Sequence, residues 1–176
     1  YPIANIARLV DGNNVNAQYG ELHCKNPAVM PGYNKLPEKT KEAFSEDGWY
    51  KTGDIMRCDE NGFHYFVGRV DDMFNCGGEN IYPSEVEKML ERHSEIEQAC
   101  VVPVTDQIKG FKPVAFVVRR EGSDLSEDGI KQYALANGPA YQHPRVVSFV
   151  KKLPLTGTNK IDRKSLVARA ESAMKI

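Results

Sequence analysis

The chain has 176 residues, of which 41% are hydrophobic and 27% charged, and its formal net charge is −1 at pH 7. This composition is that of an ordinary globular protein and gives no overall reason to expect a nucleic-acid-binding or membrane-binding protein. No apolar run approaches the roughly 18 residues of a transmembrane segment, and no signal peptide is evident.

The first part of the chain, residues 1–68, has the apolar runs and turn signals of a small antiparallel β unit. Four short stretches are expected to be strands: 6–10, 20–24, 55–58 and 63–67. The last two flank Asp59-Glu60-Asn61-Gly62, whose Asn-Gly pair favours the left-handed turn of a hairpin. A short helix is expected over 37–44, and Lys51-Thr52-Gly53-Asp54 is expected to be a turn.

Three unlike stretches then follow one another. Gly68–Asp72 is charged and turn-prone, and Cys76–Asn80 is a glycine loop. Ser84, with Glu87 three positions later, forms a capping box that predicts the start of a helix. We therefore expect a joint between two bodies, with the glycine loop carried on the second body.

The remainder of the chain alternates apolar strands with helices. Three β-branched stretches are expected to be strands: 98–104, 113–118 and 146–150. Ser126 is expected to open one helix and Asp162 to cap the last one. The predicted fold class is therefore α+β, with a small antiparallel β subdomain followed by a compact α+β C-terminal domain.

Cysteine spacing and the charge of the C-terminal tail bear on ligands. Cys24, Cys58, Cys76 and Cys100 form no C-x-x-C pair, so no metal site is expected, and reduced thiols in a cytoplasmic protein are the expectation. From residue 145 onward eight basic residues face two acidic ones. This tail is either a solvated face or a site for a phosphate-bearing ligand, and no nucleic-acid partner is expected.

Two candidate residues flank the β hairpin. Asp54 could accept hydrogen bonds from the two vicinal hydroxyls of a ribose, or could simply stabilise a turn. Arg69 could bind ribose or phosphate oxygens through its planar guanidinium, or could form a salt bridge to a neighbouring acid.

Two further candidates lie in the second body. The Gly77-Gly78 pair could let a ligand approach the backbone closely, or could make a turn, and it lacks the Gly-Lys-Ser/Thr ending of a phosphate-binding loop. Lys160 lies in a small polar loop ahead of the last predicted helix. It could neutralise charge that develops on a phosphoryl or carboxylate oxygen, or could be a solvated surface lysine.

Taken together, these stretches resemble the motifs of the acyl-adenylate-forming (AMP-binding) superfamily. The matching motifs are Tyr50–Asp54, Gly68–Asp72, Gly77–Glu87 and Asn159–Arg163, with Gly20-Glu21-Leu22 and Pro31-Gly32-Tyr33 resembling a further one. The resemblance covers essentially the whole chain. The form Gly-Gly-Glu-Asn-Ile-x-Pro-Ser-Glu is most similar to the acid–CoA ligases, including the benzoate and medium-chain types, so fatty or aromatic acid metabolism is implied.

The resemblance implies a two-step reaction. ATP and a carboxylic acid would give an acyl-adenylate and pyrophosphate; the small C-terminal domain would then rotate, and the thiol of coenzyme A (CoA) would displace AMP. Mg²⁺ would accompany ATP, with ligands outside this chain. In the first step Asp54 would hold the ribose hydroxyls, Arg69 would contact the nucleotide, and Lys160 would bridge the substrate carboxylate, the ribose and the α-phosphate.

The resemblance also assigns the hinge and the second step. Asp71 would be the hinge residue. Gly78 would line the channel for the pantetheine arm of CoA, with Gly77 and Glu79 beside it. Residues 1–68 would be the last subdomain of the large AMP-binding domain, 69–72 the hinge, and 73–176 the mobile lid domain.

The chain departs from the superfamily pattern at several points. The Ser/Thr/Gly-rich phosphate loop, the Tyr-Gly-x-Thr-Glu motif and the acyl pocket are absent, and the chain starts at Tyr1-Pro2-Ile3 without a methionine. The usual Pro-Lys-Thr-x-x-Gly-Lys has become Pro154-Leu155-Thr156-Gly157-Thr158-Asn159-Lys160. We therefore expect a fragment that needs the missing N-terminal domain and is inactive alone. Two alternatives stay open: an enzyme that loads carrier-protein pantetheine, and a non-catalytic interaction module of the same fold.

Overall fold

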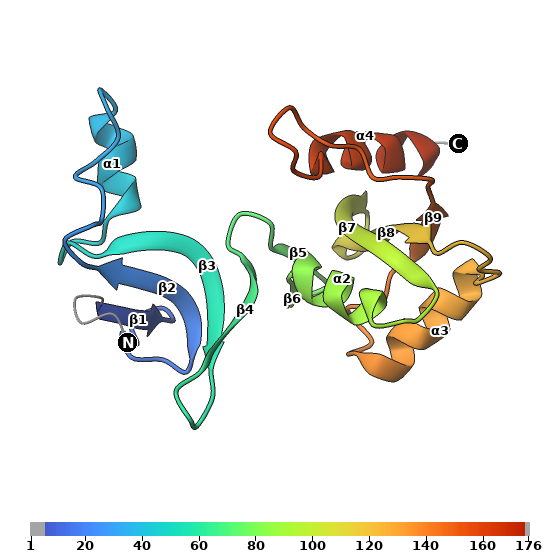
Figure 1. Cartoon of the computed structure of the whole chain (residues 1–176), viewed down its shortest axis with the longest axis horizontal. Helices are drawn as coiled ribbons and strands as arrows, with labels where there is room; N and C mark the ends of the chain where they lie inside the picture. The colour runs from blue at the N-terminus through green and yellow to red at the C-terminus, as the bar shows by residue number, and fades with distance from the viewer. Residues whose placement is uncertain (1–5, 175–176) are drawn as a thin grey trace. The chain divides into compact units, whose positions relative to one another are not determined.

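The computed structural model describes residues 6–174, which divide into two compact units (Figure 1). The first unit is Tyr1–Asp71 and the second is Asp72–Ile176. Residues 1–5 and 175–176, which belong to the predicted domains 1–68 and 73–176, lie outside the described residues. No helix within 6–174 is long and apolar enough to cross a membrane.

The first unit is a four-stranded antiparallel sheet in the order β1-β2-β3-β4, with one short helix. Its elements are β1 (Ile6–Val10), β2 (Tyr19–Lys25), α1 (Pro37–Ala43), β3 (Tyr50–Cys58) and β4 (His64–Arg69). The predicted β3–β4 hairpin is present, and Gly62 in its turn has a left-handed φ of 80°. Its core is small, with Leu9, Ile55 and Val67 as its buried aliphatic side chains among the described residues.

One prediction for this unit is wrong. Lys51–Asp54 was expected to be a turn, but β3 begins at Tyr50 and runs through these residues. They stay in the strand because the chain bulges there: Ile55 pairs with Glu21, whereas Lys51 pairs with His23. Three residues of β3 thus stand opposite one residue of β2, which turns the bulged residues outward without breaking the sheet.

The second unit is a five-stranded sheet in the order β6-β5-β8-β7, with β9 added parallel to β8. Its strands are β5 (Phe74–Cys76), β6 (Glu79–Ile81), β7 (Ile96–Asp106), β8 (Gly110–Arg119) and β9 (Val146–Phe149). Its helices are α2 (Pro83–Glu91), α3 (Glu127–Asn137) and α4 (Arg163–Met174). As predicted, Ser126 caps α3 by accepting a hydrogen bond from the amide of Gly129, and Asp162 accepts one from Ser165 at the start of α4.

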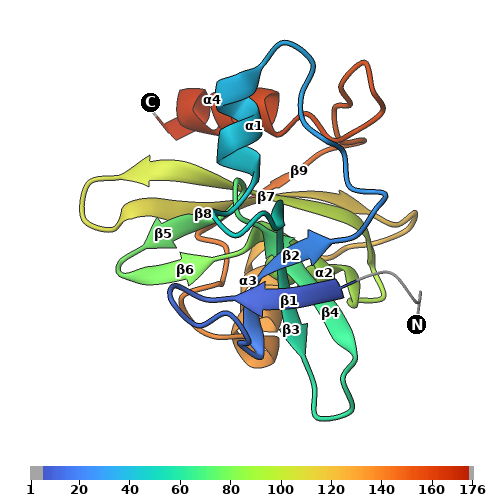
Figure 2. The ribbon, with the colours of Figure 1, turned by 90° about the vertical axis from the view of Figure 1, so that its left-hand side faces the viewer.

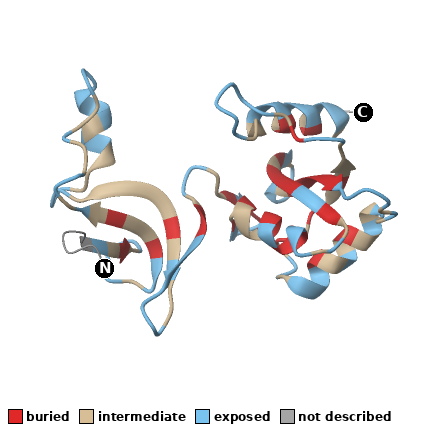
Figure 3. Ribbon diagram, viewed as in Figure 1, coloured by how far each residue is buried: buried red, intermediate tan, exposed pale blue. Residues whose placement is uncertain are grey.

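The sheet of this unit has a core on each face, and Figures 1 and 2 show α2 and α3 on one face and α4 on the other. Because successive strand residues point to opposite faces, Val101 packs with α2 and α3 whereas Cys100 and Val102 pack with α4. The buried residues of Figure 3 gather on β7 and β8 for this reason. The predicted α+β class is confirmed.

Two local predictions in the second unit are wrong. Cys76–Asn80, expected to be a loop, is a tight β5–β6 hairpin in which Gly77 and Gly78 have φ values of 62° and 95°. Two consecutive left-handed residues are what a type I′ two-residue hairpin turn requires, and glycine supplies them without strain.

The predicted capping box is also absent. The N-cap of α2 is Tyr82, and Pro83 is the first helical residue, so Ser84 already lies inside the helix. The helix begins early because the proline ring fixes φ at a helical value and has no N–H to leave unbonded. Glu87 therefore does not reach back to the helix start and instead turns toward β7.

Candidate functional site

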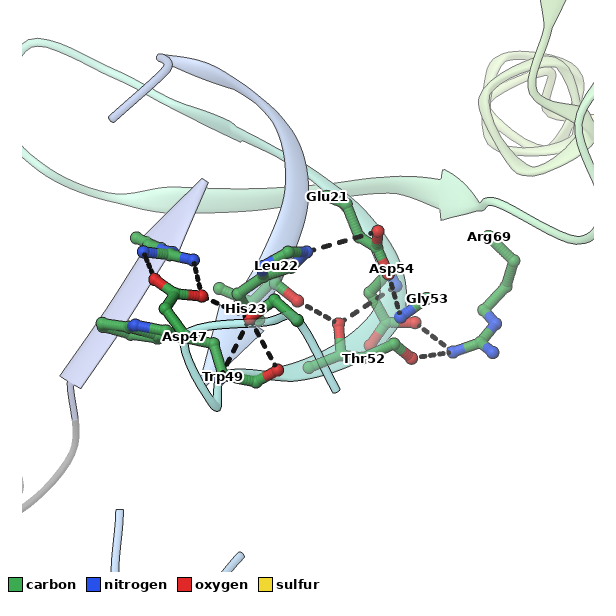
Figure 4. A network of polar contacts seen from close by, with 11 residues as sticks. Glu21, Leu22, His23, Asp47, Trp49, Thr52, Gly53, Asp54 and Arg69 are labelled. Atoms are coloured by element: carbon green, nitrogen blue, oxygen red, sulfur yellow. Dashed lines mark hydrogen bonds and ion pairs between the residues drawn. The ribbon is translucent and has the colours of Figure 1, made fainter. Parts of the chain in front are cut away.

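The bulge of β3 carries the first group of candidate residues. Gly53 has a left-handed φ of 73°, and its amide donates to Oε1 of Glu21 at 3.0 Å. The hydroxyl of Thr52 donates to the carbonyl of Leu22 at 2.8 Å (Figure 4). The bulge is thus held from β2 by a side chain on one side and by the backbone on the other.

Asp54 and Arg69 face each other across the β3–β4 ladder. Nη1 of Arg69 donates to Oδ1 of Asp54 at 2.6 Å and to the carbonyl oxygen of Thr52 at 2.9 Å (Figure 4). The two side chains remain 35% and 41% exposed, so a ligand can still reach both. The pair offers a hydrogen-bond acceptor for hydroxyl groups next to a donor for oxyanions.

Two neutral groups surround Asp54 that the sequence analysis did not single out. Burial raises the pKa of the Tyr50 phenol, and the adjacent Tyr33 raises it further. Burial also raises the pKa of the Cys24 thiol, and the negative charge of Asp54 adds to the effect. Both groups are therefore uncharged at neutral pH. Tyr50 begins the motif Tyr50–Asp54, and Tyr33 ends the motif Pro31-Gly32-Tyr33. Their place in these motifs is the signal that could have identified them.

The two acids of the predicted hinge have different partners. The carboxylate of Asp71 is 83% exposed and lies 3.6 Å from Nη2 of Arg69 in the first unit. The carboxylate of Asp72 lies 3.9 Å from Nε of Arg163 in the second unit. The chain passes from one unit to the other between these two residues.

The glycine hairpin presents bare backbone. The amide of Gly77 donates to the carbonyl of Lys109 at 3.0 Å, and the amide of Gly78 donates to Oδ1 of Asn75 at 2.9 Å. A Cβ atom added at Gly78 would meet no atom within 4 Å, and Glu79 beside it is exposed. The backbone on this side is therefore accessible to an extended ligand.

Lys160 lies at the end of a closed turn. The amide of Thr156 donates to the carbonyl of Lys160 at 2.7 Å, and the amide of Lys160 lies 3.3 Å from the Thr156 hydroxyl. Asn159 has a left-handed φ of 63°, at the position where the superfamily motif has glycine. Asparagine is one of the few other residues that adopt this conformation readily. The departure at 159 therefore keeps the turn, and Lys160 remains exposed at its end.

Arg163 lies three residues after Lys160, and its contact with Glu87 was not predicted from the sequence. Its Nη1 and Nη2 donate to the two carboxylate oxygens of Glu87 at 2.7 and 2.8 Å, and Nη1 also donates to the carbonyl of Val101 at 2.9 Å. Burial by itself would lower the pKa of Arg163, but the hydrogen bonds and charge of Glu87 raise it above the usual value. The sequence signal for this contact is that Glu87, an acid, lies on the same face of α2 as the apolar Val86 and Leu90. A buried acid needs a partner.

The predicted site residues thus fall into separate groups. Asp54, Arg69 and Asp71 lie together in the first unit, Gly77–Glu79 form a hairpin of the second, and Lys160 stands on its own turn there. Their roles toward a ligand stay predictions.

Comparison with known proteins gives a consistent family signal. Residues 85–160 match the AMP-binding enzyme C-terminal domain. The chain is 38% identical over 159 residues to peroxisomal OPC-8:0-CoA ligase 1 of Arabidopsis thaliana, covering 90% of this chain and 29% of the relative. It is 38% identical over 157 residues to the mitochondrial medium-chain acyl-CoA ligase ACSF2 of Rattus norvegicus, covering 89% and 26%. It therefore spans less than a third of the length of these relatives.

Solved structures agree with the sequence matches. The ATP-bound MatB of Rhodopseudomonas palustris superimposes with a TM-score of 0.86 and 28% identity, over 97% of this chain and 35% of that one. The anthranilate CoA ligase AuaEII, solved with anthranoyl-AMP, superimposes with a TM-score of 0.84 and 29% identity, over 99% and 35%. These neighbours bind a nucleotide and an acyl-adenylate, respectively.

Proposed function

This chain belongs to the acyl-adenylate-forming, or AMP-binding, superfamily, and from that premise we propose that it is the C-terminal part of an ATP-dependent carboxylic acid–CoA ligase. The observation that carries the proposal is the Asp54–Arg69 pair, in which a carboxylate on the β3 bulge and a guanidinium at the end of β4 lie side by side and are both partly exposed. The names of the relatives, which are CoA ligases, support the reaction class.

In the first proposed step a carboxylate oxygen of the substrate attacks the α-phosphorus of ATP, and the bond from that phosphorus to pyrophosphate breaks. Asp54 accepts hydrogen bonds from the ribose hydroxyls, and Arg69 contacts the nucleotide oxygens. The Lys160 ammonium lies against the substrate carboxylate, the ribose and the α-phosphate, where it offsets the negative charge that develops in the transition state.

In the second proposed step the CoA sulfur attacks the acyl carbonyl carbon, and the bond to AMP breaks. The second unit turns about Asp71 between the steps, which withdraws Lys160 and brings the glycine hairpin to the active site. The pantetheine arm then runs along Gly78, with Gly77 and Glu79 beside it, because the open side of this hairpin has no side chain to obstruct it.

Mg²⁺ is expected to enter with ATP. Among residues 6–174 no group of three or more His, Cys, Asp or Glu side chains could hold a metal ion, so no residue of this chain is proposed as its ligand. The acid substrate is either a fatty or an aromatic acid. The proposed cytoplasmic location stays a prediction, since the relatives include peroxisomal and mitochondrial proteins.

Two other functions fit the same fold. An adenylating enzyme that loads the pantetheine arm of a carrier protein would use the same hairpin. A non-catalytic interaction module would need neither step, and it would leave the partly exposed Asp54–Arg69 pair without a ligand.

The test is incubation of the full-length protein that carries this chain with ATP, CoA and a panel of fatty and aromatic acids, with detection of AMP and acyl-CoA. We expect both products for at least one acid and neither from the 176-residue chain alone. Acid-dependent pyrophosphate release without acyl-CoA would favour the enzyme that loads a carrier protein. Absence of any acid-dependent AMP or pyrophosphate release would rule out both enzymes.

A further inference from the structure

The second unit contains an ion pair between the buried Glu87 and the partly buried Arg163, and the two-step reaction assigns no role to it. Glu87 on α2 is 8% exposed, and its two oxygens meet the two terminal nitrogens of Arg163 in a bidentate contact. Such a pair fixes the guanidinium in both direction and plane, because both donors are held at once. Arg163 is the first residue of α4 and follows Lys160 by only three positions.

Both members of the Glu87–Arg163 pair also bind the backbone of β7. Strand β7 pairs only with β8 in the described sheet, so the peptide groups on its outer edge need other partners. At Val101 the amide donates to Oε1 of Glu87 at 2.7 Å, and the carbonyl accepts from Nη1 of Arg163 at 2.9 Å. The ion pair therefore sits at a defined point on the sheet edge.

The same guanidinium faces the start of the second unit. Its Nε lies 3.9 Å from the carboxylate of Asp72, the residue that follows the proposed hinge position Asp71. Glu87 lies on the helix that directly follows the glycine hairpin. One side chain thus links the segment after the hinge, the helix behind the hairpin, and the base of the Lys160 turn.

We propose that Arg163 is a positioning residue that fastens the turn Leu155–Ile161 to the rigid part of the second unit, so that Lys160 moves with that unit as one body. Most of the turn is exposed, and it is closed by few internal bonds: those between Thr156 and Lys160, the one from Asn159 to Thr156 and a contact between the Thr156 and Thr158 hydroxyls. Just outside it, the amide of Asp162 donates to the carbonyl of Pro154 at 2.8 Å. Without an anchor at its end, the lysine would keep its chemistry but lose its fixed location. This inference rests on the proposed function for its effect on catalysis, but not for its effect on the turn.

The experiment compares two variants of the full-length protein. In the double variant Glu87→Gln with Arg163→Met, the ion pair is removed while an amide oxygen remains at position 87 to accept from Val101. Removing both charges avoids leaving one of them buried and unpaired. Lys164→Met is the matched control: it removes a positive charge one residue further along α4 from an exposed side chain.

The first readout is hydrogen–deuterium exchange in peptides covering 153–162. We expect exchange in this segment to rise about fivefold or more in the double variant, with the β7–β8 ladder unchanged and Lys164→Met like the parent, because the turn opens locally. Equal exchange in all three proteins would overturn the inference. If the double variant does not fold, Arg163→Lys, which keeps the charge but loses the bidentate contact, is expected to loosen the same segment.

The second readout separates the half-reactions. We expect adenylation to fall about 10- to 100-fold, while thioester formation from preformed acyl-adenylate stays within about threefold, because misplacing one catalytic group affects the step that uses it. Equal losses in both steps would mean a merely structural role. If Lys160→Ala leaves adenylation intact, the proposed catalytic role of Lys160 fails, whereas the exchange result still decides whether Arg163 positions the turn. If the parent protein shows no acid-dependent adenylation at all, the proposed function fails, and the exchange result is unaffected.

Discussion

Gly53 lies so close beneath the guanidinium of Arg69 that a Cβ atom at position 53 would come within 2.8 Å of Nη2. The left-handed backbone of Gly53 and the absence of its side chain together make room for the Asp54–Arg69 contact. The glycine of this motif is therefore explained by the arginine that packs on it, 16 residues further along the chain.

Gly53→Ala should weaken ATP binding by the full-length protein about tenfold, because the methyl group pushes the guanidinium away from Asp54. It should also cost about 1–2 kcal/mol of unfolding free energy for the left-handed backbone. Gly62→Ala is the control: its φ is 80°, but a Cβ there would meet no atom within 4 Å. Gly62→Ala should lower the unfolding free energy but leave ATP binding unchanged. An equal loss of ATP binding in both variants would contradict the role of Gly53 in making room for the Asp54–Arg69 contact.

Lys160→Ala should lower the adenylation rate by about two orders of magnitude or more while leaving thioester formation from preformed acyl-adenylate largely intact. Single-turnover assays of each half-reaction measure this. Lys152→Ala, which removes another exposed lysine ahead of the turn, should leave both rates unchanged. A comparable fall in both half-reactions would argue against the proposed role of Lys160.

Asp71→Pro should slow the second half-reaction most, because proline fixes φ at the proposed pivot. The expected loss is about 10-fold or more in acyl-CoA formation, with adenylation less affected. Asp71→Ala removes the exposed carboxylate but leaves the backbone free, and it should retain most activity. Normal turnover of the proline variant would exclude a pivot at this residue.

Cys100 should resist alkylation in the folded chain. It is fully buried, and burial raises the pKa of its thiol to about 12 against the opposing charge of Arg163. At pH 8.5 roughly one thiol in a thousand or fewer would then be ionised. Mass spectrometry after iodoacetamide treatment should show Cys58, which is only half-buried, labelled first and Cys100 labelled only after denaturation. Early labelling of Cys100 would show that this core opens readily.

Acid should weaken the first unit through Asp47. The Arg8 guanidinium, followed by the Ser45 hydroxyl, holds the pKa of this carboxyl at about 2. Because the folded pKa is lower than the unfolded value of about 4, the stabilisation is complete above pH 4 and disappears as the pH falls through 2. The melting temperatures of the parent and Asp47→Asn should therefore differ at pH 6 and converge near pH 2. Equal melting temperatures of the two proteins at pH 6 would contradict this role of Asp47.

Most elements of the fold could be predicted because their signals are local. The Asn61-Gly62 turn, the Ser126 and Asp162 caps and the β-branched runs of β7 and β8 each act within a few residues. The failures have equally local causes. Gly77-Gly78 read as a loop because a two-residue hairpin needs only three residues in each strand, which is too short for an alternating pattern. Ser84 and Glu87 have the spacing of a capping box, but Pro83 is already the first helical residue, so the N-cap is Tyr82.

The sequence by itself determined the superfamily, the α+β class and the candidate residues, since motifs and periodicity are properties of neighbouring positions. Only the tertiary structure decided which of those residues touch. It brought Arg69 over Gly53 and onto Asp54, and it joined Glu87 to Arg163 across 76 positions. The reason is physical. A charged side chain in a sequence is expected to lie at the surface. Only the packing of α2 and α4 at the edge of β7 shows that Arg163 is held in place beside the turn that carries Lys160.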